Sequence, residues 1–197
     1  MKKLILASNN DHKIKEFREI FTDYEILSLN DIWFFDDIVE DWETFLENAL
    51  IKCNALHEFL ENKWIEAEII ADDSWLCVNA LNGAPGVYSA RYAWWHWDNV
   101  ANRAKLLKEL EWKDDKSAYF LCCIVKMYPN WEYIYSEWKT FGKILTEEIW
   151  DKSFGYDCLF FSDDLQKSFW EAGDEEKNAV SHRWRAIAAL MEQTHNI

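Results

Sequence analysis

The chain has 197 residues, of which 50% are hydrophobic and 29% charged; this is the composition of a folded globular protein and excludes a disordered one. Its formal charge of −15 excludes a nucleic-acid partner, because proteins that bind a phosphate backbone need a basic surface. A single nucleotide needs only a local group of lysines and arginines and stays compatible with this charge.

The chain begins with a short apolar segment at residues 4–7, which predicts a buried first strand. The segment is too short for the core of a signal peptide or for a membrane span, so we expect no membrane partner. The five cysteines are an odd number and contain no C-x-x-C pair. This usage favours small buried side chains in a reducing compartment over disulfides or a metal site, and it predicts a cytoplasmic protein.

Strands and helices alternate along the first half of the chain, and strands dominate after it. Apolar runs predict strands at residues 4–7, 25–29, 69–71, 118–127, 132–136 and 159–161. Apolar residues at helical spacing predict helices around residues 14–21, 45–60, 100–110 and 180–191. This order predicts an α/β protein with a mixed sheet. Because no segment rich in proline, glycine or serine interrupts the chain, we expect a single domain over residues 1–197.

Two polar motifs follow predicted strands in the first half of the chain. Ser8–Lys13 precedes a helix, where backbone N–H groups, short polar side chains and a lysine suit a phosphate chain, although such loops are also polar merely because they are solvated. Asp72 and Asp73 follow the third strand, and two carboxylates at a strand end can hold Mg²⁺. A solvated acidic turn is the alternative, and Glu40-Asp41 is ambiguous in the same way.

Two further motifs lie near the end of the chain. Residues 153–157 read Ser-Phe-Gly-Tyr-Asp and offer aromatic rings that could stack on a base. Lys177, His182 and Arg183 offer donors for an oxygen-rich ligand. Taken separately, a residue like Phe154 more often belongs to a hydrophobic core, and a pair like His182-Arg183 more often belongs to a helix surface.

Six segments occur in the order of the signatures of a known family. They are SNNDHK, TFLENALIKC, ADDS, NGAPGVYSARYA, SFGYD and EEKNAVSHR. Together they resemble the inosine triphosphate pyrophosphatase family, over nearly the whole chain from about residue 4 to about residue 190. Members of that family hydrolyse non-standard purine nucleoside triphosphates.

The resemblance implies an elongated α/β fold with two lobes around a central nucleotide-binding cleft, usually as a homodimer. It implies that Glu40 and Asp73 hold Mg²⁺ and that Asp73 is the general base. The implied substrate-binding residues are Ser8, Asn9, Asn10, Asp11, His12, Lys13 and Lys52 for the triphosphate, Ser74 for a further substrate contact, Phe154, Gly155, Tyr156 and Asp157 for the base and sugar, and Lys177, His182 and Arg183 for the base pocket.

In the implied reaction, water oriented by the metal and Asp73 attacks the α-phosphorus of ITP, dITP or XTP, and pyrophosphate leaves. His182 and Arg183 would donate to the 6-oxo group of hypoxanthine or xanthine. Adenine presents an amino donor there, and a buried donor left unpaired costs ~1–3 kcal/mol. Guanine shares the 6-oxo group, so these residues do not explain how GTP would be rejected.

Tryptophan stands at several positions where the family motifs have glycine. Examples are Trp75 in ADDSWL, Trp184 in SHRWRA and Trp131 in PNWE, where P-N-G would signal a hairpin. The chain has 13 tryptophans and only 5 glycines, well below the usual glycine share of about 7%.

Our hypothesis is that UGA codons, which certain bacterial lineages read as glycine, have been translated as tryptophan. It predicts that most tryptophans lie in loops or at element ends, that they are exposed, and that several have positive φ. The rival is a set of genuine tryptophans that form an aromatic ligand platform. That rival leaves a second function open, a non-catalytic nucleotide- or glycan-binding protein with a site remodelled by Trp75 and Trp184.

Overall fold

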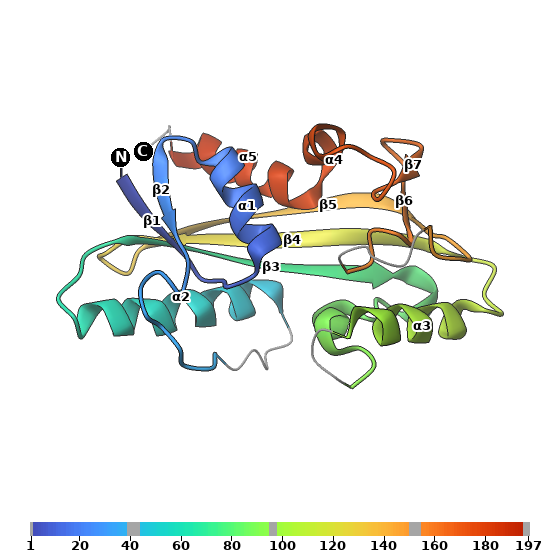
Figure 1. The fold of residues 1–197 in the computed structure, drawn as a ribbon, viewed down its shortest axis with the longest axis horizontal. Helices are drawn as coiled ribbons and strands as arrows, with labels where there is room; N and C mark the ends of the chain where they lie inside the picture. Colours follow the sequence, from blue (N-terminus) through green and yellow to red (C-terminus); the bar gives the residue numbers. More distant parts are fainter. Residues whose placement is uncertain (1, 39–43, 95–97, 150–154, 195–197) are drawn as a thin grey trace. The chain divides into compact units, whose positions relative to one another are not determined.

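The computed structural model describes residues 2–38, 44–94, 98–149 and 155–194. Its helices are α1 (Asp11–Ile20), α2 (Phe45–Glu61), α3 (Asn99–Leu110), α4 (Asp174–Val180) and α5 (His182–Thr194), with short 3-10 helices η1 (Asn79–Leu81) and η2 (Gly86–Arg91). Its strands are β1 (Lys2–Leu6), β2 (Tyr24–Leu27), β3 (Glu68–Val78), β4 (Ser117–Met127), β5 (Tyr133–Ile144), β6 (Phe160–Ser162) and β7 (Lys167–Ser168) (Figure 1).

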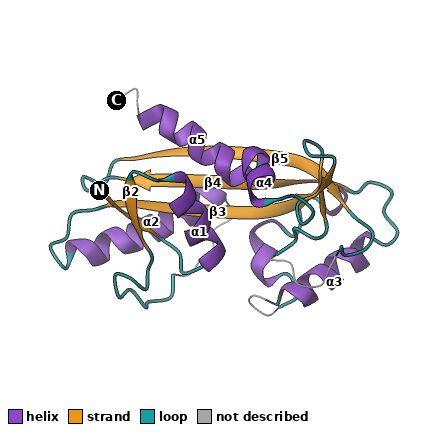
Figure 2. Cartoon of the chain, turned by 45° about the horizontal axis from the view of Figure 1, so that its top comes forward, coloured by secondary structure: helices purple, strands orange, loops and turns teal. Residues whose placement is uncertain are grey.

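The strands of the described residues form one sheet in the order β2-β1-β3-β4-β5-β6-β7. β1 runs parallel to both β2 and β3, whereas β6 is antiparallel to both β5 and β7. Figure 2 shows the long strands β3, β4 and β5 next to one another, as this order requires. The predicted α/β class with a mixed sheet is confirmed.

The chain divides into two compact units. Unit 1 comprises Met1–Asp73, Cys123–Glu137 and Ala186–Ile197, and unit 2 comprises Ser74–Cys122 and Trp138–Arg185. The first boundary falls inside β3, between Asp73 and Ser74.

The core of unit 1 packs α2 against β1, β3 and β4. Thr44 caps the helix, because its hydroxyl oxygen accepts a hydrogen bond from the N–H of Glu47 at 3.3 Å. The predicted apolar stripe of α2 is buried against the sheet. The buried cluster contains Ala49, Cys53, Leu56 and Leu60 with Ile5, Ala7, Ile69, Ala71, Val125 and Met127.

Within unit 1, α1 lies on the other side of the strands from α2 (Figure 1). Alternate residues of a strand point to opposite faces. Ile69 and Ala71 pack with α2, so Asp73 points to the α2 face and Asp72 to the α1 face. This alternation decides which lysine each carboxylate can meet.

The core of unit 2 is rich in aromatic rings from β4, from β6 and from the residue that follows β7. Phe120, Phe160 and Phe169 have ring centroids 4.7–5.9 Å apart. They are buried with Leu76, Val78, Leu106, Leu110, Cys158 and Leu159 among others.

Among the described residues, no helix of the chain combines the length and apolar character that crossing a bilayer requires.

The cysteines behave as the sequence predicted. Cys53, Cys77, Cys122, Cys123 and Cys158 are all buried, and none forms a disulfide. Burial raises the pKa of the Cys53 thiol and that of the Cys77 thiol above their ordinary values, which keeps both groups in the unreactive thiol form.

Three predicted elements have different limits in the structure. The predicted strand 69–71 continues through the polar residues Asp72–Ser74 as β3, because the side chains of both aspartates find partners there. The prediction that the carboxylates lie at a strand end was therefore wrong. The predicted strand 132–136 likewise extends to Ile144 as β5.

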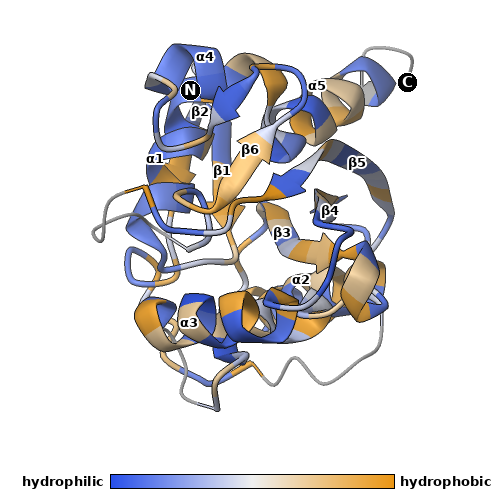
Figure 3. Ribbon diagram, turned by 90° about the vertical axis from the view of Figure 1, so that its right-hand side faces the viewer, coloured by the Kyte–Doolittle hydropathy of each residue, from blue (hydrophilic) through white to orange (hydrophobic). Residues whose placement is uncertain are grey.

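The predicted C-terminal helix is two helices, α4 and α5. Ser181 has extended backbone angles, which ends α4. Its hydroxyl oxygen then accepts a hydrogen bond from the N–H of Trp184 at 3.2 Å and so caps α5. Figure 3 colours most of α4 as hydrophilic, which agrees with its lack of buried residues.

Most of the described tryptophans occupy the positions that the decoding hypothesis predicts. Those at 42, 95, 97 and 150 lie outside the described residues, which leaves nine of the thirteen. Six of the nine lie in loops or turns, and four have positive φ. Trp75 is an exception, since it is 5% exposed inside β3. The tryptophans' occurrence in turns and at positive φ favours the decoding hypothesis over an aromatic platform.

Candidate active site

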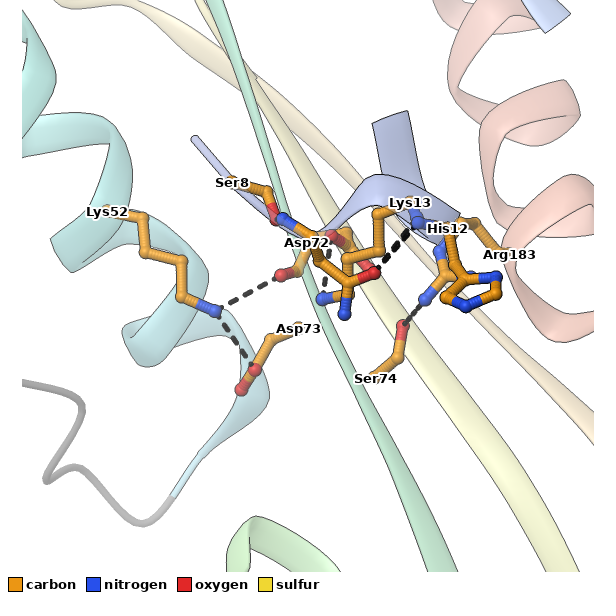
Figure 4. A network of polar contacts seen from close by, with 9 residues as sticks. Ser8, His12, Lys13, Lys52, Asp72, Asp73, Ser74 and Arg183 are labelled. Carbon is orange, nitrogen blue, oxygen red and sulfur yellow. Dashed lines mark hydrogen bonds and ion pairs between the residues drawn. The ribbon is translucent and has the colours of Figure 1, made fainter. Parts of the chain in front are cut away.

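Two neighbouring carboxylates of β3 form the centre of the candidate site in unit 1. Both side chains are almost fully buried. Lys13 of α1 places its Nζ 3.0 Å from Asp72 Oδ1. Lys52 of α2 places its Nζ 3.3 Å from Asp73 Oδ1 and donates a hydrogen bond to the carbonyl oxygen of Asp72 at 3.2 Å (Figure 4). We call Lys13, Lys52, Asp72 and Asp73 the lysine–aspartate cluster.

The cluster pairs two lysines with two carboxylates, and all of it except the half-buried Lys13 is buried. Removing two carboxylates from water is costly unless opposite charges compensate, and the two ammonium groups supply that compensation. The sequence separates these residues widely, and the strand alternation brings one lysine to each carboxylate. Lys13, Lys52 and Asp73 therefore converge as the resemblance implied.

The predicted phosphate loop before α1 uses most of its side chains locally. Asn10 Oδ1 accepts hydrogen bonds from the N–H groups of His12 at 3.0 Å and Lys13 at 3.3 Å, which caps the helix. Ser8 Oγ accepts from the N–H of Asn10 at 3.1 Å, and Asn9 Oδ1 accepts from the N–H of Asn30 at 2.9 Å. Asp11 and His12 are exposed in the first turn.

Unit 2 holds the predicted base-binding residues in two groups. In the first, Arg183 Nη2 donates a hydrogen bond to Ser74 Oγ at 3.3 Å (Figure 4). In the second, Lys177 Nζ lies 2.7 Å from Asp157 Oδ2. Two predicted residues, Glu40 and Phe154, lie outside the described residues.

The aromatic core links these groups within unit 2. The His182 ring stacks on Phe120, with centroids 4.9 Å apart and an angle of 11° between the rings. Phe120 in turn stacks on Phe169, and Lys177 Nζ lies 5.8 Å from the centre of the Phe169 ring. His182 and Arg183 are both buried, so the alternative reading of an exposed helix surface was wrong.

The loop at Gly155–Asp157 is fixed by contacts from three elements. Arg103 of α3 donates to the carbonyl oxygen of Gly155 at 3.0 Å, and Lys177 pairs with Asp157. The Tyr156 hydroxyl donates to the carbonyl oxygen of Ser89 at 2.9 Å. Burial raises the pKa of the Tyr156 hydroxyl, so it stays a neutral donor.

The sequence reasoning gave no role to several buried polar residues near this loop. Asn102 accepts a hydrogen bond from the N–H of Ala93 at 2.7 Å and donates to the carbonyl oxygens of Ser89 and Ala90. Arg103, beside it in α3, is 1% exposed. The signal that could have found them is the pair of polar residues within the apolar periodicity of that helix.

Comparisons with known proteins agree with these motifs. The model of a family described as the Ham1 family matches residues 4–193. The chain is 46% identical to a dITP/XTP pyrophosphatase of Clostridium perfringens, over 100% of this chain and 99% of that protein. It is 43% identical to a dITP/XTP pyrophosphatase of Desulfotalea psychrophila, over 98% of this chain and 86% of that protein.

Solved structures match over nearly the whole chain. The Ham1 protein of Staphylococcus aureus is 36% identical with a TM-score of 0.87, and 99% of each chain is covered. The nucleoside-triphosphatase / dITP/XTP pyrophosphatase of Mycobacterium abscessus is 35% identical with a TM-score of 0.75, covering 95% of this chain and 98% of that one. The fold and the motif order thus point to the same group of proteins.

Proposed function

Because this chain belongs to the Ham1 family, we propose that it is a dITP/XTP pyrophosphatase, which hydrolyses dITP, XTP and ITP to the nucleoside monophosphate and pyrophosphate. The observation that carries the assignment is the lysine–aspartate cluster. It places the buried ammonium group of Lys52 and the half-buried one of Lys13 beside two buried carboxylates, one of which is the residue that the family motif makes the general base.

Asp73 is the proposed base, and Lys52 keeps it in the required state. An ammonium group 3.3 Å away favours the ionised carboxylate, which is the form that accepts a proton from water. Asp72 is the second candidate, but it points to the α1 face and pairs with Lys13. Lys13 and Lys52 would also offset the negative charge that develops on the leaving pyrophosphate.

The charge balance of the cluster supports a requirement for Mg²⁺. With two cations and two anions the cluster has no excess positive charge to attract a triphosphate. Carboxylate oxygens are the ligands that Mg²⁺ prefers, and Asp73 with Glu40 would hold it. No three metal-ligating side chains gather among the described residues, but Mg²⁺ commonly takes one or two carboxylates and completes its shell with water and phosphate oxygens. When bound, it would supply positive charge at the phosphate chain.

The base-binding residues of the proposal are those in unit 2. His182, Arg183 and Lys177 would serve as donors for the 6-oxo group, and Gly155–Asp157 would contact the base and sugar. The Arg183 guanidinium is positioned by its hydrogen bond to Ser74. Since adenine lacks a 6-oxo acceptor, buried donors at this position disfavour it.

A substrate panel tests the proposed function. Pyrophosphate release is measured with Mg²⁺ for dITP, XTP, ITP, dATP and GTP, for the wild-type chain, for Asp73→Asn and for Asp37→Asn, which removes one exposed carboxylate as a control. We expect turnover of dITP, XTP and ITP, its loss in Asp73→Asn, and no change in Asp37→Asn. Binding of these nucleotides without pyrophosphate release would favour a non-catalytic binding protein instead.

The homodimer and the cytoplasmic location are also proposed. All five cysteines are buried and none forms a disulfide, which supports a reducing compartment. The assembly is tested by sedimentation equilibrium, for which we expect twice the chain mass, and a single-chain mass would refute the dimer.

A further inference from the structure

A buried arginine outside the proposed substrate-binding set holds the loop that contains Gly155. Arg103 of α3 is 1% exposed and is among the largest fully buried side chains of the described residues. A buried guanidinium is tolerated only where acceptors satisfy its N–H groups and an anion balances its charge. Its partners therefore indicate which segment it fixes.

Those partners lie at two points of the chain, seven residues apart in the sequence. Arg103 Nε lies 3.1 Å from Glu148 Oε2, and Arg103 Nη1 donates to the carbonyl oxygen of Gly155 at 3.0 Å. Glu148 precedes and Gly155 follows the stretch 149–154. One rigid, planar group thus contacts the chain before and after this stretch.

We infer that Arg103 is a positioning residue for the purine-binding loop, acting through Gly155 and Glu148. The inference rests on the proposed function, in which Gly155–Asp157 contact the base and sugar. A guanidinium directs several N–H donors in fixed directions, whereas a lysine at this position has one mobile ammonium group and cannot reproduce both contacts.

The test measures nucleotide affinity separately from turnover. We expect Arg103→Met and Arg103→Lys to raise KM for dITP by roughly tenfold or more, with a much smaller change in kcat, because loop misplacement weakens binding of the base. Binding of inorganic tripolyphosphate, which has no base, should be unchanged. If Arg103→Met does not fold by circular dichroism, the comparison uses Arg103→Lys and Glu148→Gln.

Lys126→Met is the matched control. Lys126 is also a buried cation in an ion pair, 2.9 Å from Glu68, but it lies in unit 1 on β4. Its loss should lower the melting temperature and leave KM for dITP unchanged. The inference would be overturned if the wild-type chain is active and both Arg103 variants have the same KM for dITP as the wild-type chain. A wild-type chain without pyrophosphate release would instead refute the proposed function.

The backbone conformation of four tryptophans supports a second inference independently. Trp33, Trp64, Trp94 and Trp131 have φ of 59°, 58°, 83° and 67°. This left-handed region brings Cβ close to the backbone, so glycine is the residue that normally occupies it.

Two of these tryptophans lie just after a helical turn, at the left-handed position that glycine normally occupies. After α2, Ile65 N–H bonds to the carbonyl oxygen of Leu60 and Trp64 N–H bonds to that of Glu61, both at 3.0 Å. This pair of hydrogen bonds defines the Schellman motif, and Trp64 occupies its glycine position. Trp33 occupies the same position in the turn 29–34, with corresponding bonds of 2.9 and 3.2 Å.

The chain provides its own comparison for this motif. Gly83 N–H bonds to the carbonyl oxygen of Val78 at 3.0 Å, and Asn82 N–H bonds to that of Asn79 at 3.1 Å. The residue at the left-handed position is here Asn82, with φ of 53°. Asparagine is the non-glycine residue that tolerates this conformation best, whereas tryptophan has no such tolerance.

The turn between β4 and β5 gives the same result for a hairpin. Tyr128 N–H bonds to the carbonyl oxygen of Glu132 at 2.8 Å, and Trp131 N–H bonds to that of Tyr128 at 3.0 Å. Trp131 is thus the left-handed residue of a three-residue hairpin loop, a position that favours glycine. Its ring packs against that of His57, with centroids 3.8 Å apart and an angle of 31° between the rings. Trp64 and Trp94 are 96% and 88% exposed, so packing does not compensate there.

The geometry points to glycine at Trp33, Trp64, Trp94 and Trp131 in the natural protein, encoded by UGA codons that its source reads as glycine. The test sequences the gene and analyses the protein from its native source by peptide mass spectrometry. We expect UGA at all four positions and peptides that carry glycine there. A UGG codon with an indole in the peptide at any of the four would overturn the inference.

Discussion

Replacing Trp64 by glycine should stabilise the protein, although it removes the largest side chain. The ring is 96% exposed, so its removal forfeits little buried apolar area. A non-glycine residue in the left-handed region costs roughly 1–2 kcal/mol. Glycine also lowers the free energy of unfolding by about 0.5–1 kcal/mol, because it gives the unfolded chain more conformational freedom. The net gain for Trp64→Gly is therefore about 0–1.5 kcal/mol, and four such sites together would give ~0–6 kcal/mol.

The assays are reversible urea unfolding and thermal unfolding, both followed by far-ultraviolet circular dichroism, because indole fluorescence changes with the substitution itself. The four-site variant should gain a few degrees in Tm per kcal/mol, as expected for a chain of this size. Single variants at the four sites should sum to the combined value, since the sites share no described contact with one another.

Trp138→Gly is the matched control. Trp138 is 43% exposed and lies inside β5, where the backbone is extended and glycine is unfavourable. We expect this variant to lose roughly 1 kcal/mol of stability while Trp64→Gly gains. Equal losses in both variants would refute the argument from backbone conformation.

Three further results are expected. Lys52→Met should lose most turnover of dITP in steady-state assays, because Asp73 loses its ion-pair partner, and unchanged kcat would remove Lys52 from the site. The native protein should resist a thiol reagent until it is unfolded, because burial raises the pKa values of Cys53 and Cys77 and leaves almost no thiolate near neutral pH; rapid labelling of the native chain would contradict this burial. Removal of divalent cations with a chelator should abolish pyrophosphate release, and added Mg²⁺ should restore it; full activity after chelation would refute the metal requirement.

Elements set by local periodicity were predictable from the sequence. The helix α2 follows from an apolar stripe and its Thr44 cap, and both signals lie within one short segment. The extent of β3 could not be predicted in the same way. Asp72 and Asp73 resemble a solvated turn, and their burial depends on lysines that other elements supply.

The break between α4 and α5 had a local signal that periodicity obscured. Ser181 is a good N-cap residue, and its hydrogen-bond partner Trp184 lies three residues later, in the first turn of α5. The apolar spacing from Val180 to Met191 nevertheless fits one continuous helix. β7, with two residues, is too short for any alternating pattern.

Site residues that belong to a recognisable motif could be predicted from the sequence. Site residues whose role depends on packing against other parts of the fold could not. Lys13, Lys52 and Asp73 were assigned through the resemblance, and the structure brings them together. Arg103 carries no motif, and its role depends on a loop far along the chain. The positive φ values at turn tryptophans were predictable, because turn chemistry demands glycine from local sequence alone.

The position of water attack tests the central claim most directly. The wild-type chain is incubated with dITP and Mg²⁺ in isotopically labelled water, and both products are analysed by mass spectrometry. If water attacks the α-phosphorus, the label enters dIMP and the pyrophosphate stays unlabelled. Label in pyrophosphate or in inorganic phosphate, with none in the nucleotide product, would contradict the proposed reaction.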